Sequence, residues 1–360
     1  MNNILKKNFY KKRIVVTGHS GFKGSWLTLW LKTYNAKIMG ISNKILTSPN
    51  HFEELKIKKK ISDKKIDIKN LDKLKNTIKK FKPDYLFHFA AQSIVSKSYE
   101  DPIDTWQTNT MGTINVLETL KSFKHNCVAI IITSDKCYRN FEIKRGYSEN
   151  DILGGNDPYG GSKAAAEIGI KTYFESFLKD KKNIKIGVAR AGNVIGGGDW
   201  TSNRLIPDCI KSWSKKRFVK IRNLHSTRPW QHVLEAVYGY MLLSSKIKKN
   251  TNLNGQAFNF GPKNKSNYSV NSVLSHAKKK WNNAKWIHKK NSRSFGESSL
   301  LKLNSNKAKK VLSWECVLNF SETIDLTINW YKNFYNKNYR SVEDLSIKDL
   351  EYYKKKAKIL

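Results

Sequence analysis

The stretch that decides the fold is Arg13-Ile-Val-Val-Thr-Gly-His-Ser-Gly-Phe-Lys-Gly24. Its first part ends in four β-branched side chains, as in a buried strand, and residues 22–34 have apolar side chains at helical spacing. Three glycines lie between them. Glycine is needed where a chain turns sharply and where its backbone approaches a diphosphate, and the start of the next helix offers unpaired N–H groups. The pattern predicts a strand–turn–helix unit that holds a dinucleotide. Its predicted cofactor-binding residues are Gly18, Ser20, Gly21, Phe22, Lys23 and Gly24.

The alternation of strand and helix continues through the first half of the chain. Further strands are predicted at 37–42, 65–68, 84–89, 128–133 and 184–191, and helices at 71–81 and 102–123. Strands that alternate with helices over short turns favour a parallel sheet covered on both faces. The predicted fold class is therefore α/β, with a doubly wound parallel sheet of the Rossmann type.

The alternation becomes irregular beyond residue 191, where Gly196-Gly-Gly198 marks a loop. We therefore predict a dinucleotide-binding domain at 1–191, a smaller C-terminal α/β substrate lobe at 192–335 and a peripheral tail at 336–360. Residues 232–260 belong to the second half but could pack back on the first domain.

The composition is strongly basic, with 67 Lys and Arg residues against 29 Asp and Glu residues and a formal net charge of +38. Such an excess can mark a surface for nucleic acid or acidic lipid. The lysines are spread through every region without a stripe of interleaved aromatics, so we interpret them as solvated polar positions and expect no specific nucleic-acid partner. No apolar run approaches the roughly 20 residues of a membrane span, so no membrane partner is expected.

Four cysteines, Cys127, Cys137, Cys209 and Cys316, are far apart and form no CxxC pair, and the eight histidines show no ligand spacing. This pattern argues against a disulfide framework and against a metal site. It is typical of a protein of the reducing cytoplasm.

The second strand does not end in the acidic residue that would bind a ribose hydroxyl of NAD. Ser42-Asn43-Lys44 stands there instead, so this position leaves NAD and NADP both open. Asp67 and Ile68, at the end of the predicted third strand, could contact the adenine. Alternatively, Asp67 is a strand-end carboxylate that water solvates.

Tyr159-Gly-Gly-Ser-Lys163 places a phenol and an ammonium one helical turn apart. A tyrosine of ordinary pKa, about 10, acts as a base only beside a cation that favours its phenolate, and Lys163 supplies one. This pair has little meaning alone in a lysine-rich chain. Its position gives it weight, because it follows Thr133-Ser134-Asp135-Lys136 at the end of an apolar strand, where open α/β sheets bind ligands.

Further motifs extend over residues 13 to about 332. They are His88-Phe-Ala-Ala-Gln-Ser93, Asn109-Thr-Met-Gly-Thr113, Asp157-Pro-Tyr-Gly-Gly-Ser-Lys163, Arg190-Ala-Gly-Asn-Val-Ile-Gly-Gly-Gly-Asp-Trp200 and Arg228-Pro-Trp-Gln-His-Val233. With the glycine bend and the Ser134-Asp-Lys136 segment, they resemble the extended short-chain dehydrogenases/reductases that act on sugar nucleotides, and among these the 4,6-dehydratases.

The resemblance implies an internal redox elimination on CDP-D-glucose, with a tightly bound NAD that is recycled in each turnover. It implies that Tyr159, assisted by Ser134 and Lys163, removes the proton of the C4 hydroxyl. The further cofactor-binding residues that it implies are Phe89, Ala90, Ala91, Asn109 and Thr133. The substrate-binding residues that follow from the resemblance or from position are Gln92, Ser93, Asn193, Trp200, Arg204, Leu205, Arg222 and Arg228. It also implies a homodimer or higher homo-oligomer, with an interface through helices near 102–123 and 158–178.

Asp135 is the candidate acid that protonates the departing C6 hydroxyl, which requires burial to keep the carboxyl protonated. Related dTDP-glucose dehydratases carry Asp-Glu where this chain has Asp135-Lys136. Our hypothesis is that Lys136 is the C5 base; alternatively, its ammonium only stabilises the enolate oxygen. Two other classes also stay open, another nucleotide-sugar epimerase or decarboxylase on the same scaffold, and a non-catalytic NAD-bound regulator or basic nucleic-acid binder.

Overall fold

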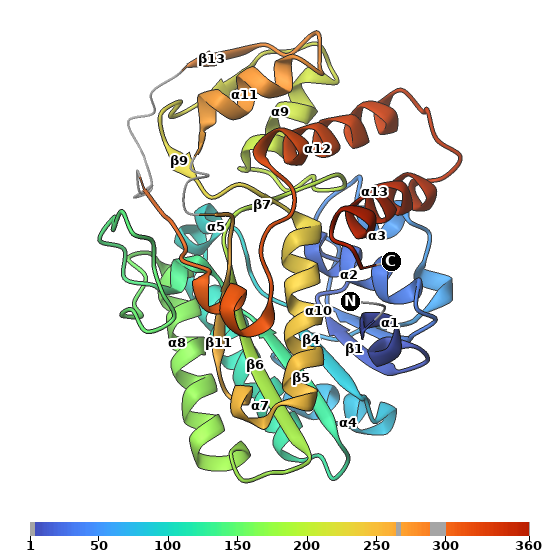
Figure 1. Cartoon of the computed structure of the whole chain (residues 1–360), viewed down its shortest axis with the longest axis vertical. Helices are drawn as coiled ribbons and strands as arrows, with labels where there is room; N and C mark the ends of the chain where they lie inside the picture. Colours follow the sequence, from blue (N-terminus) through green and yellow to red (C-terminus); the bar gives the residue numbers. More distant parts are fainter. Residues whose placement is uncertain (1–3, 264–267, 289–299, 360) are drawn as a thin grey trace.

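The computed structural model describes residues 4–263, 268–288 and 300–359. Its centre is a seven-stranded sheet in which every neighbouring pair is parallel, in the order β3-β2-β1-β4-β5-β6-β11 (Figure 1). The strands are β1 Arg13–Thr17, β2 Lys37–Ser42, β3 Ser62–Lys65, β4 Tyr85–His88, β5 Cys127–Ile132, β6 Ile184–Ala191 and β11 Ala257–Phe260. The doubly wound α/β fold expected from the sequence is confirmed.

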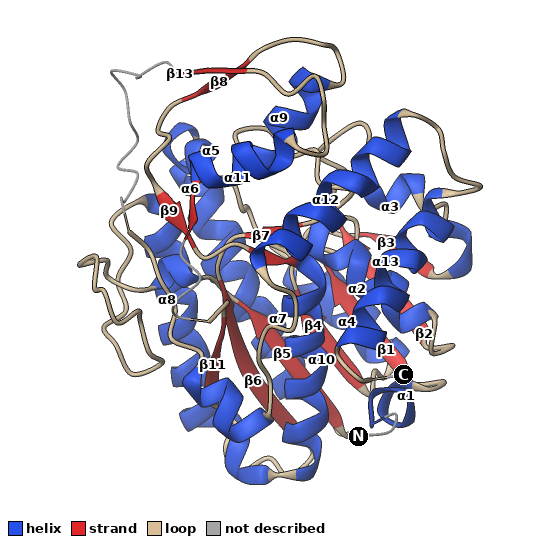
Figure 2. Ribbon diagram, turned by 45° about the horizontal axis from the view of Figure 1, so that its top comes forward, coloured by secondary structure: helices blue, strands red, loops and turns tan. Residues whose placement is uncertain are grey.

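Helices cover both faces of this sheet (Figure 2). The helices of its first half are α1 Ile4–Phe9, α2 Phe22–Lys32, α3 His51–Glu54, α4 Leu71–Phe81, α5 Val95–Glu100, α6 Pro102–Trp106, α7 Gly112–Lys121 and α8 Pro158–Tyr173. Those that follow are α9 Leu205–Trp213, α10 Val233–Lys249, α11 Val270–Lys278, α12 Phe320–Tyr335 and α13 Val342–Lys356. One apolar cluster lies under α4, α7 and α8, and a larger one joins the other face of the sheet to α2, α10, α12 and α13.

The second half of the chain adds three small ribbons beyond the carboxyl ends of the main strands. The paired strands are β7 Val194–Ile195 with β10 Gln231–His232, β8 Val219–Ile221 with β13 Trp286–His288, and β9 Thr227–Arg228 with β12 Tyr268–Ser269. Within residues 232–260, α10 packs on the sheet and β11 extends it beside β6. The predicted domain limits at 191 and 335 stay a prediction.

The third strand was placed wrongly by the sequence pattern. It was predicted at 65–68, but the ladder with β2 runs over Ser62–Lys65. Ile66 and Ile68 are buried beneath the neighbouring helices without belonging to the strand. β3 is an edge strand made of polar residues. The apolar residues that follow it pack in the core, so the hydrophobic pattern identified the packed segment and not the paired strand.

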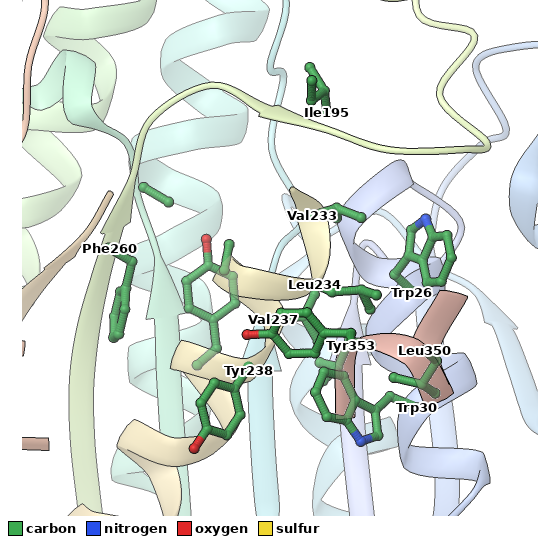
Figure 3. Close-up of a cluster of buried hydrophobic side chains, with 14 of the residues drawn as sticks. Trp26, Trp30, Ile195, Val233, Leu234, Val237, Tyr238, Phe260, Leu350 and Tyr353 are labelled. Atoms are coloured by element: carbon green, nitrogen blue, oxygen red, sulfur yellow. The ribbon is translucent and has the colours of Figure 1, made fainter. Parts of the chain in front are cut away.

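The segment predicted as a peripheral helix or tail packs on the core of the protein. Residues 336–360 contain α13, which places Leu350 and Tyr353 in the core against Trp30 of α2 and the start of α10 (Figure 3). Glu235 of α10 fixes this arrangement. One of its oxygens accepts the N–H groups of Val317 and Leu318, both at 2.8 Å, and the other accepts the Tyr353 hydroxyl at 2.7 Å.

Burial raises the pKa of Glu235 from 4.5 to about 7. The folded state therefore binds more protons than the unfolded state between these values, so this group lowers the stability as the pH rises from 4.5 to 7, by roughly 3 kcal/mol. Glu235→Gln keeps an acceptor for the two N–H groups and has no charge to desolvate. We expect the melting temperature of Glu235→Gln to fall less than that of the wild type between pH 5 and pH 8. If the melting temperatures of the two proteins changed equally with pH over this range, this assignment would be contradicted.

Candidate active site

A cavity of about 640 Å³ opens at the carboxyl ends of the parallel strands, between the sheet and the second half of the chain. The sequence-predicted residues that line it are Gly18, Ser20, Gly21, Phe22, Lys23, Gly24, Asp67, Ile68, Phe89, Ala90, Ala91, Gln92, Ser93, Thr133, Ser134, Asp135, Lys136, Tyr159, Asn193, Trp200, Arg204, Leu205, Arg222 and Arg228. Asn109 and Lys163 do not line it. One cavity thus brings together residues separated by more than two hundred positions in the chain.

The glycine bend needs its glycines for close backbone packing. Gly18 has a φ of +74°, and a Cβ there would lie 2.6 Å from the amide nitrogen of Ala90 on the neighbouring strand connection. A Cβ on Gly24 would lie 2.2 Å from the Gly18 carbonyl oxygen. Gly21 is exposed and begins α2 without any side-chain cap. The N-terminus of α2 is therefore presented bare at the cavity, which fits the diphosphate of a dinucleotide.

His19 of the bend points away from the cavity. Its ring is 1% exposed, lies 2.9 Å from Asp63 and 3.0 Å from the Ser42 hydroxyl, and occupies the space that a Cβ on Gly40 would need. Burial lowers the pKa of His19 below its usual 6.5. The histidine thus fixes the bend onto β2 from behind.

At the far end of the bend, Asp67 lines the cavity two residues after β3. One of its oxygens accepts the amide of Asn43 at 3.3 Å, and the other accepts the backbone N–H of Lys69 at 2.9 Å. Asn43 and Lys44 also line this part of the cavity. The segment that replaces the missing acidic residue of the second strand is therefore hydrogen-bonded to Asp67.

Asn109 lies behind the cavity wall, fully buried. Its amide accepts the backbone N–H of Gln92 at 2.9 Å and donates to the Gln92 carbonyl at 3.0 Å and to the Ser162 hydroxyl at 2.9 Å. The Gln92 amide is likewise engaged with Ile94 and Thr105. Both residues were predicted to contact ligands directly. In the structure only Gln92 lines the cavity, and the side-chain bonds of both residues hold the strand connection in place.

Asp135 is the most unusual group of the site. It is 3% exposed, in the 3-10 turn Asp135–Cys137 that follows β5. The Ser134 hydroxyl donates to one of its oxygens at 3.0 Å, whereas its other oxygen is buried without a hydrogen-bond partner among the described residues. Burial raises the pKa of Asp135, although the charge of Lys136 opposes the shift. The cavity therefore contains a carboxyl group biased toward its protonated form.

Tyr159 and Lys163 lie on the first turns of α8, which Asp157 caps through the N–H of Gly160 at 2.9 Å. Burial raises the pKa of Tyr159 to about 12, while the Ser134 hydroxyl and the charge of Arg204 lower it. Burial lowers the pKa of Lys163 to about 8, against the charge of Glu167 one turn further on. The phenol and the amine are thus both desolvated.

A buried ion pair supports these groups from behind, and the sequence motifs did not single it out as a pair. Glu167 and Arg190 form two parallel hydrogen bonds of 2.8 Å. Arg190 also donates to the Tyr138 hydroxyl at 2.7 Å, and Thr133 donates to Glu167. The pair therefore ties β5, β6 and α8 together at the level of the reacting groups. A helical i to i+4 spacing from Lys163 is the only sequence signal for Glu167.

Each glycine of the Gly196-Gly-Gly-Asp-Trp200 loop faces a different part of the molecule. A Cβ on Gly197 would lie 2.1 Å from the Trp330 ring of α12, and one on Gly198 would lie 2.6 Å from His51. The Tyr331 hydroxyl bonds to the backbone of Asp199, whose carboxylate is 3.0 Å from Arg204. Trp200 lines the cavity but is 1% exposed, so most of it packs in the core.

Arg204 extends from the loop toward the first half of the chain. Besides Asp199, its guanidinium bonds to the Ser93 hydroxyl at 3.3 Å. Its charge, with that of Lys163, adds to burial in lowering the pKa of Lys23 to about 8. Burial raises the pKa of Asp135, and the charges of Lys136, Lys23 and Arg228 oppose that rise. Cations therefore converge on the cavity from both halves, as a ligand with several phosphates requires.

The structure adds cavity residues that the sequence did not single out as site residues. They are Asn43, Lys44, Leu46, Thr47, Asn50, Lys69, Ile94, Val95, Ser96, Lys97, Asp104, Thr108, Asp199, Asp208, Lys220, Asn223, Ser226 and Val270, among others. The sequence did offer Trp230, with Trp200, as a wall of the nucleotide pocket or as a core residue, and it lines the cavity. Trp230 is 7% exposed and donates to the carbonyl of Tyr268 at 3.0 Å. Most of these residues follow strands or begin helices, but only the packing of the two halves shows that they face one space.

Two negative findings delimit the site. In the described part of the chain, no cluster of three or more His, Cys, Asp or Glu side chains could hold a metal ion. Among the helices of the described ranges, none is long and apolar enough to cross a membrane.

Comparison with known proteins agrees with this geometry. Residues 15–327 match the family model described as GDP-mannose 4,6 dehydratase. The chain is 39% identical over 335 residues to the CDP-glucose 4,6-dehydratase of Salmonella typhimurium, covering 91% of this chain and 93% of that protein.

Solved structures share the fold at lower identity. An epimerase from Methanothermobacter thermautotrophicus superposes with a TM-score of 0.79 at 22% identity, over 92% of this chain and 96% of that one. A dTDP-glucose 4,6-dehydratase of Bacillus anthracis, solved in complex with NAD, gives a TM-score of 0.72 at 21% identity, over 89% and 97% of the two chains. The extent of the family match and the identity to the Salmonella enzyme show that the chain belongs to the GDP-mannose 4,6 dehydratase family of extended short-chain dehydrogenases/reductases.

Proposed function

We propose that the protein is an NAD-dependent hydro-lyase that converts CDP-D-glucose to CDP-4-dehydro-6-deoxy-D-glucose. The Salmonella relative carries that activity in its name, and the family is that of a nucleotide-sugar dehydratase. The observation that carries the proposal is the buried, partly unpartnered carboxyl of Asp135 beside Lys136 in the same cavity as Tyr159. Simple epimerisation at C4 has no use for an acid that expels a C6 hydroxyl.

The glycine bend and the cations around it fit a dinucleotide. The bare N-terminus of α2 and Lys23 would hold the diphosphate, Asp67 and Ile68 the adenosine end, and Ala90 and Ala91 the wall of the same groove. When bound, NAD accepts a hydride from C4 of the sugar and later delivers it to C6.

Tyr159 is assigned as the base that removes the proton of the C4 hydroxyl. With its pKa near 12 the phenol is neutral in the free protein, and nearby positive charge favours its ionised form. Ser134 contacts both Tyr159 and Asp135, so it aligns the two groups on one sugar. Lys163 lies one helical turn after Tyr159, outside the lining of the cavity, and its desolvated amine beside Glu167 can support proton transfer to Tyr159.

Asp135 and Lys136 are assigned as the acid and the base that eliminate water across C5 and C6. Once C4 is a ketone, the C5 proton becomes acidic; the Lys136 amine removes it, and Asp135 gives its proton to the C6 hydroxyl, which leaves as water. Saturation of the C5–C6 double bond would need the hydride that bound NAD would supply at C6, together with a proton at C5. In heavy water this proton is a deuteron, so the product carries one deuterium at C5.

We expect Lys136→Met to lose C5 exchange along with product formation, because no amine remains to take the C5 proton. Loss of turnover by about 10²- to 10⁴-fold is the usual range for a missing general base. Lys136→Arg is the matched control, since it keeps a cation but cannot act as a base at neutral pH. NMR of the sugar in heavy water measures the exchange. If exchange in Lys136→Arg stays near the wild-type rate, the lysine is an electrostatic stabiliser and the base lies elsewhere.

The proposal itself is tested by incubating the protein with CDP-, dTDP- and GDP-hexoses without added reductant and following the sugar by NMR. The expected result is a new C6 methyl group from CDP-glucose. Inversion at C4 without a methyl group would make the protein an epimerase, and loss of carbon dioxide from a hexuronate would make it a decarboxylase. No turnover of any sugar nucleotide would overturn the proposed function altogether.

We further propose a homodimer in the cytoplasm. Exposed apolar side chains gather on the helices 102–123 and 158–178, where α6 and α7 pack against α8: Ile103, Trp106, Met111, Ile168 and Phe177. Two copies could cover this surface as a four-helix interface. Four buried, unpaired cysteines fit a reducing compartment. Sedimentation of the purified protein should give the mass of two chains, and a mass of one chain would overturn the dimer.

A further inference from the structure

The end of the cavity beneath α9 is built differently from the rest. It is lined by the first turn of α9, by β8 and by the connection after β8, elements that contact one another. The residues of this base pocket, as we call it, are Ile206, Pro207, Asp208, Val219, Ile221, Asn223 and Ser226. Ile206, Val219 and Ile221 are 2–5% exposed and form apolar walls. Apolar walls with a few polar groups are typical of pockets for planar rings.

Two polar side chains of the base pocket have hydrogen-bonding capacity to spare. The Ser226 hydroxyl is buried, with the residue 5% exposed, and has no partner among the described residues. Asp208 lines the pocket, and burial raises its pKa against the charges of Lys211 and Arg222 and a hydrogen bond from the Asn203 N–H. A carboxylate that contacts one backbone N–H retains a second oxygen for a ligand.

The pyrimidine bases differ at the edge that such groups contact. Cytosine has an amino group at C4 and an acceptor at N3, whereas uracil and thymine have a carbonyl at C4 and an N–H at N3. A carboxylate accepts from an amino group and repels a carbonyl oxygen. A hydroxyl can donate to N3 of cytosine or accept from N3–H of uracil, so it does not discriminate. A carboxylate and a hydroxyl that line the same pocket therefore favour cytosine, and the carboxylate carries the preference.

We propose that the base pocket holds the cytosine of the substrate and that Asp208 is the specificity-determining residue, accepting from its 4-amino group while Ser226 binds N3. This inference rests on the proposed function for the identity of the substrate. It assigns the base preference to a carboxylate for which the sequence motifs gave no signal. Because this assignment places Asp208 at the base and away from the sugar, its loss should weaken binding without slowing the chemical step.

Asp208→Asn is the informative substitution. The carboxamide keeps an oxygen for the Asn203 N–H and replaces the other oxygen by a donor that suits a carbonyl at C4. Asp72→Asn is the matched control, because Asp72 is an exposed acidic residue in the first turn of α4. Ser226→Ala removes the hydroxyl that does not discriminate. Titration calorimetry with CDP, UDP, dTDP and GDP measures binding without any requirement for turnover.

The wild type should bind CDP more tightly than UDP and dTDP by about 10²-fold, because a site built to hydrogen-bond a polar group rejects ligands that lack that group. In Asp208→Asn the ratio of the affinities should fall to about 1 to 3. Ser226→Ala should weaken CDP and UDP equally, and Asp72→Asn should change neither. An unchanged CDP-to-UDP ratio in Asp208→Asn would overturn the inference, as would equal weakening of all four nucleotides together with a lower melting temperature. A wild type that prefers GDP would overturn the assignment to cytosine, since guanine also offers N–H donors to a carboxylate. Selective CDP binding through Asp208 without formation of a C6 methyl group would instead refute the proposed function and leave this inference standing.

Discussion

Tyr159→Phe should abolish turnover of CDP-glucose while leaving the protein folded. The substitution keeps the buried ring and deletes the hydroxyl that takes the C4 proton. A missing general base lowers kcat by about 10²- to 10⁴-fold, and the C4 oxidation precedes every later step, so no intermediate should accumulate. The measurement is methyl formation by NMR together with the absorbance of reduced nicotinamide, and both should stay at background.

The control for Tyr159→Phe is ligand binding. The phenol contributes a proton transfer and one hydrogen bond to Ser134, so CDP affinity and melting temperature should remain near the wild-type values. Activity within tenfold of the wild type would show that another group removes the C4 proton. A melting temperature far below the wild type would instead mean that the hydroxyl is needed for folding, and the catalytic assignment would then lose its support.

Asp135→Asn should separate the oxidation from the elimination. The carboxamide has nearly the shape of the carboxylic acid and keeps the bond from Ser134, but it has no acidic proton for the C6 hydroxyl. We expect product formation to fall by about 10²- to 10⁴-fold while C4 oxidation and C5 exchange continue. Reduced nicotinamide should therefore accumulate to one equivalent per active site, and C5 of recovered substrate should carry deuterium from heavy water.

The pH dependence gives a second check on Asp135. Burial raises its pKa, so the protonated form that can donate is present below that raised value and is lost as the pH rises through it. The wild-type rate of elimination should fall on the alkaline side for this reason, and Asp135→Asn should lose that limb of the profile. Normal product formation by Asp135→Asn, or an unchanged alkaline limb, would assign the acid to another residue.

The local sequence pattern was sufficient for much of the fold. The predicted limits are correct for β1, β2, α4 and β6. An apolar strand between polar ends, or an amphipathic helix, can be recognised from residues only a few positions apart. The glycine bend was also predictable from local sequence, because Gly18 has a positive φ and a Cβ on Gly24 would clash with the Gly18 carbonyl oxygen. The pattern failed at β3, where a polar edge strand is defined only by its partner β2.

By itself, then, the sequence determined the doubly wound sheet, the dinucleotide bend and the set of residues from Ser134 to Lys136 and from Tyr159 to Lys163 as candidates for one site. Only the tertiary structure decided that Asp135 keeps an unpartnered oxygen, that Asn109 lies behind the wall, and that Asp208 and Ser226 face the cavity. It also decided that α13 belongs to the core. The physical reason is the distance along the chain over which each feature is determined. Strands, turns and helices depend on contacts between near neighbours, whereas burial and desolvation depend on segments far apart in the sequence that meet only in the folded protein.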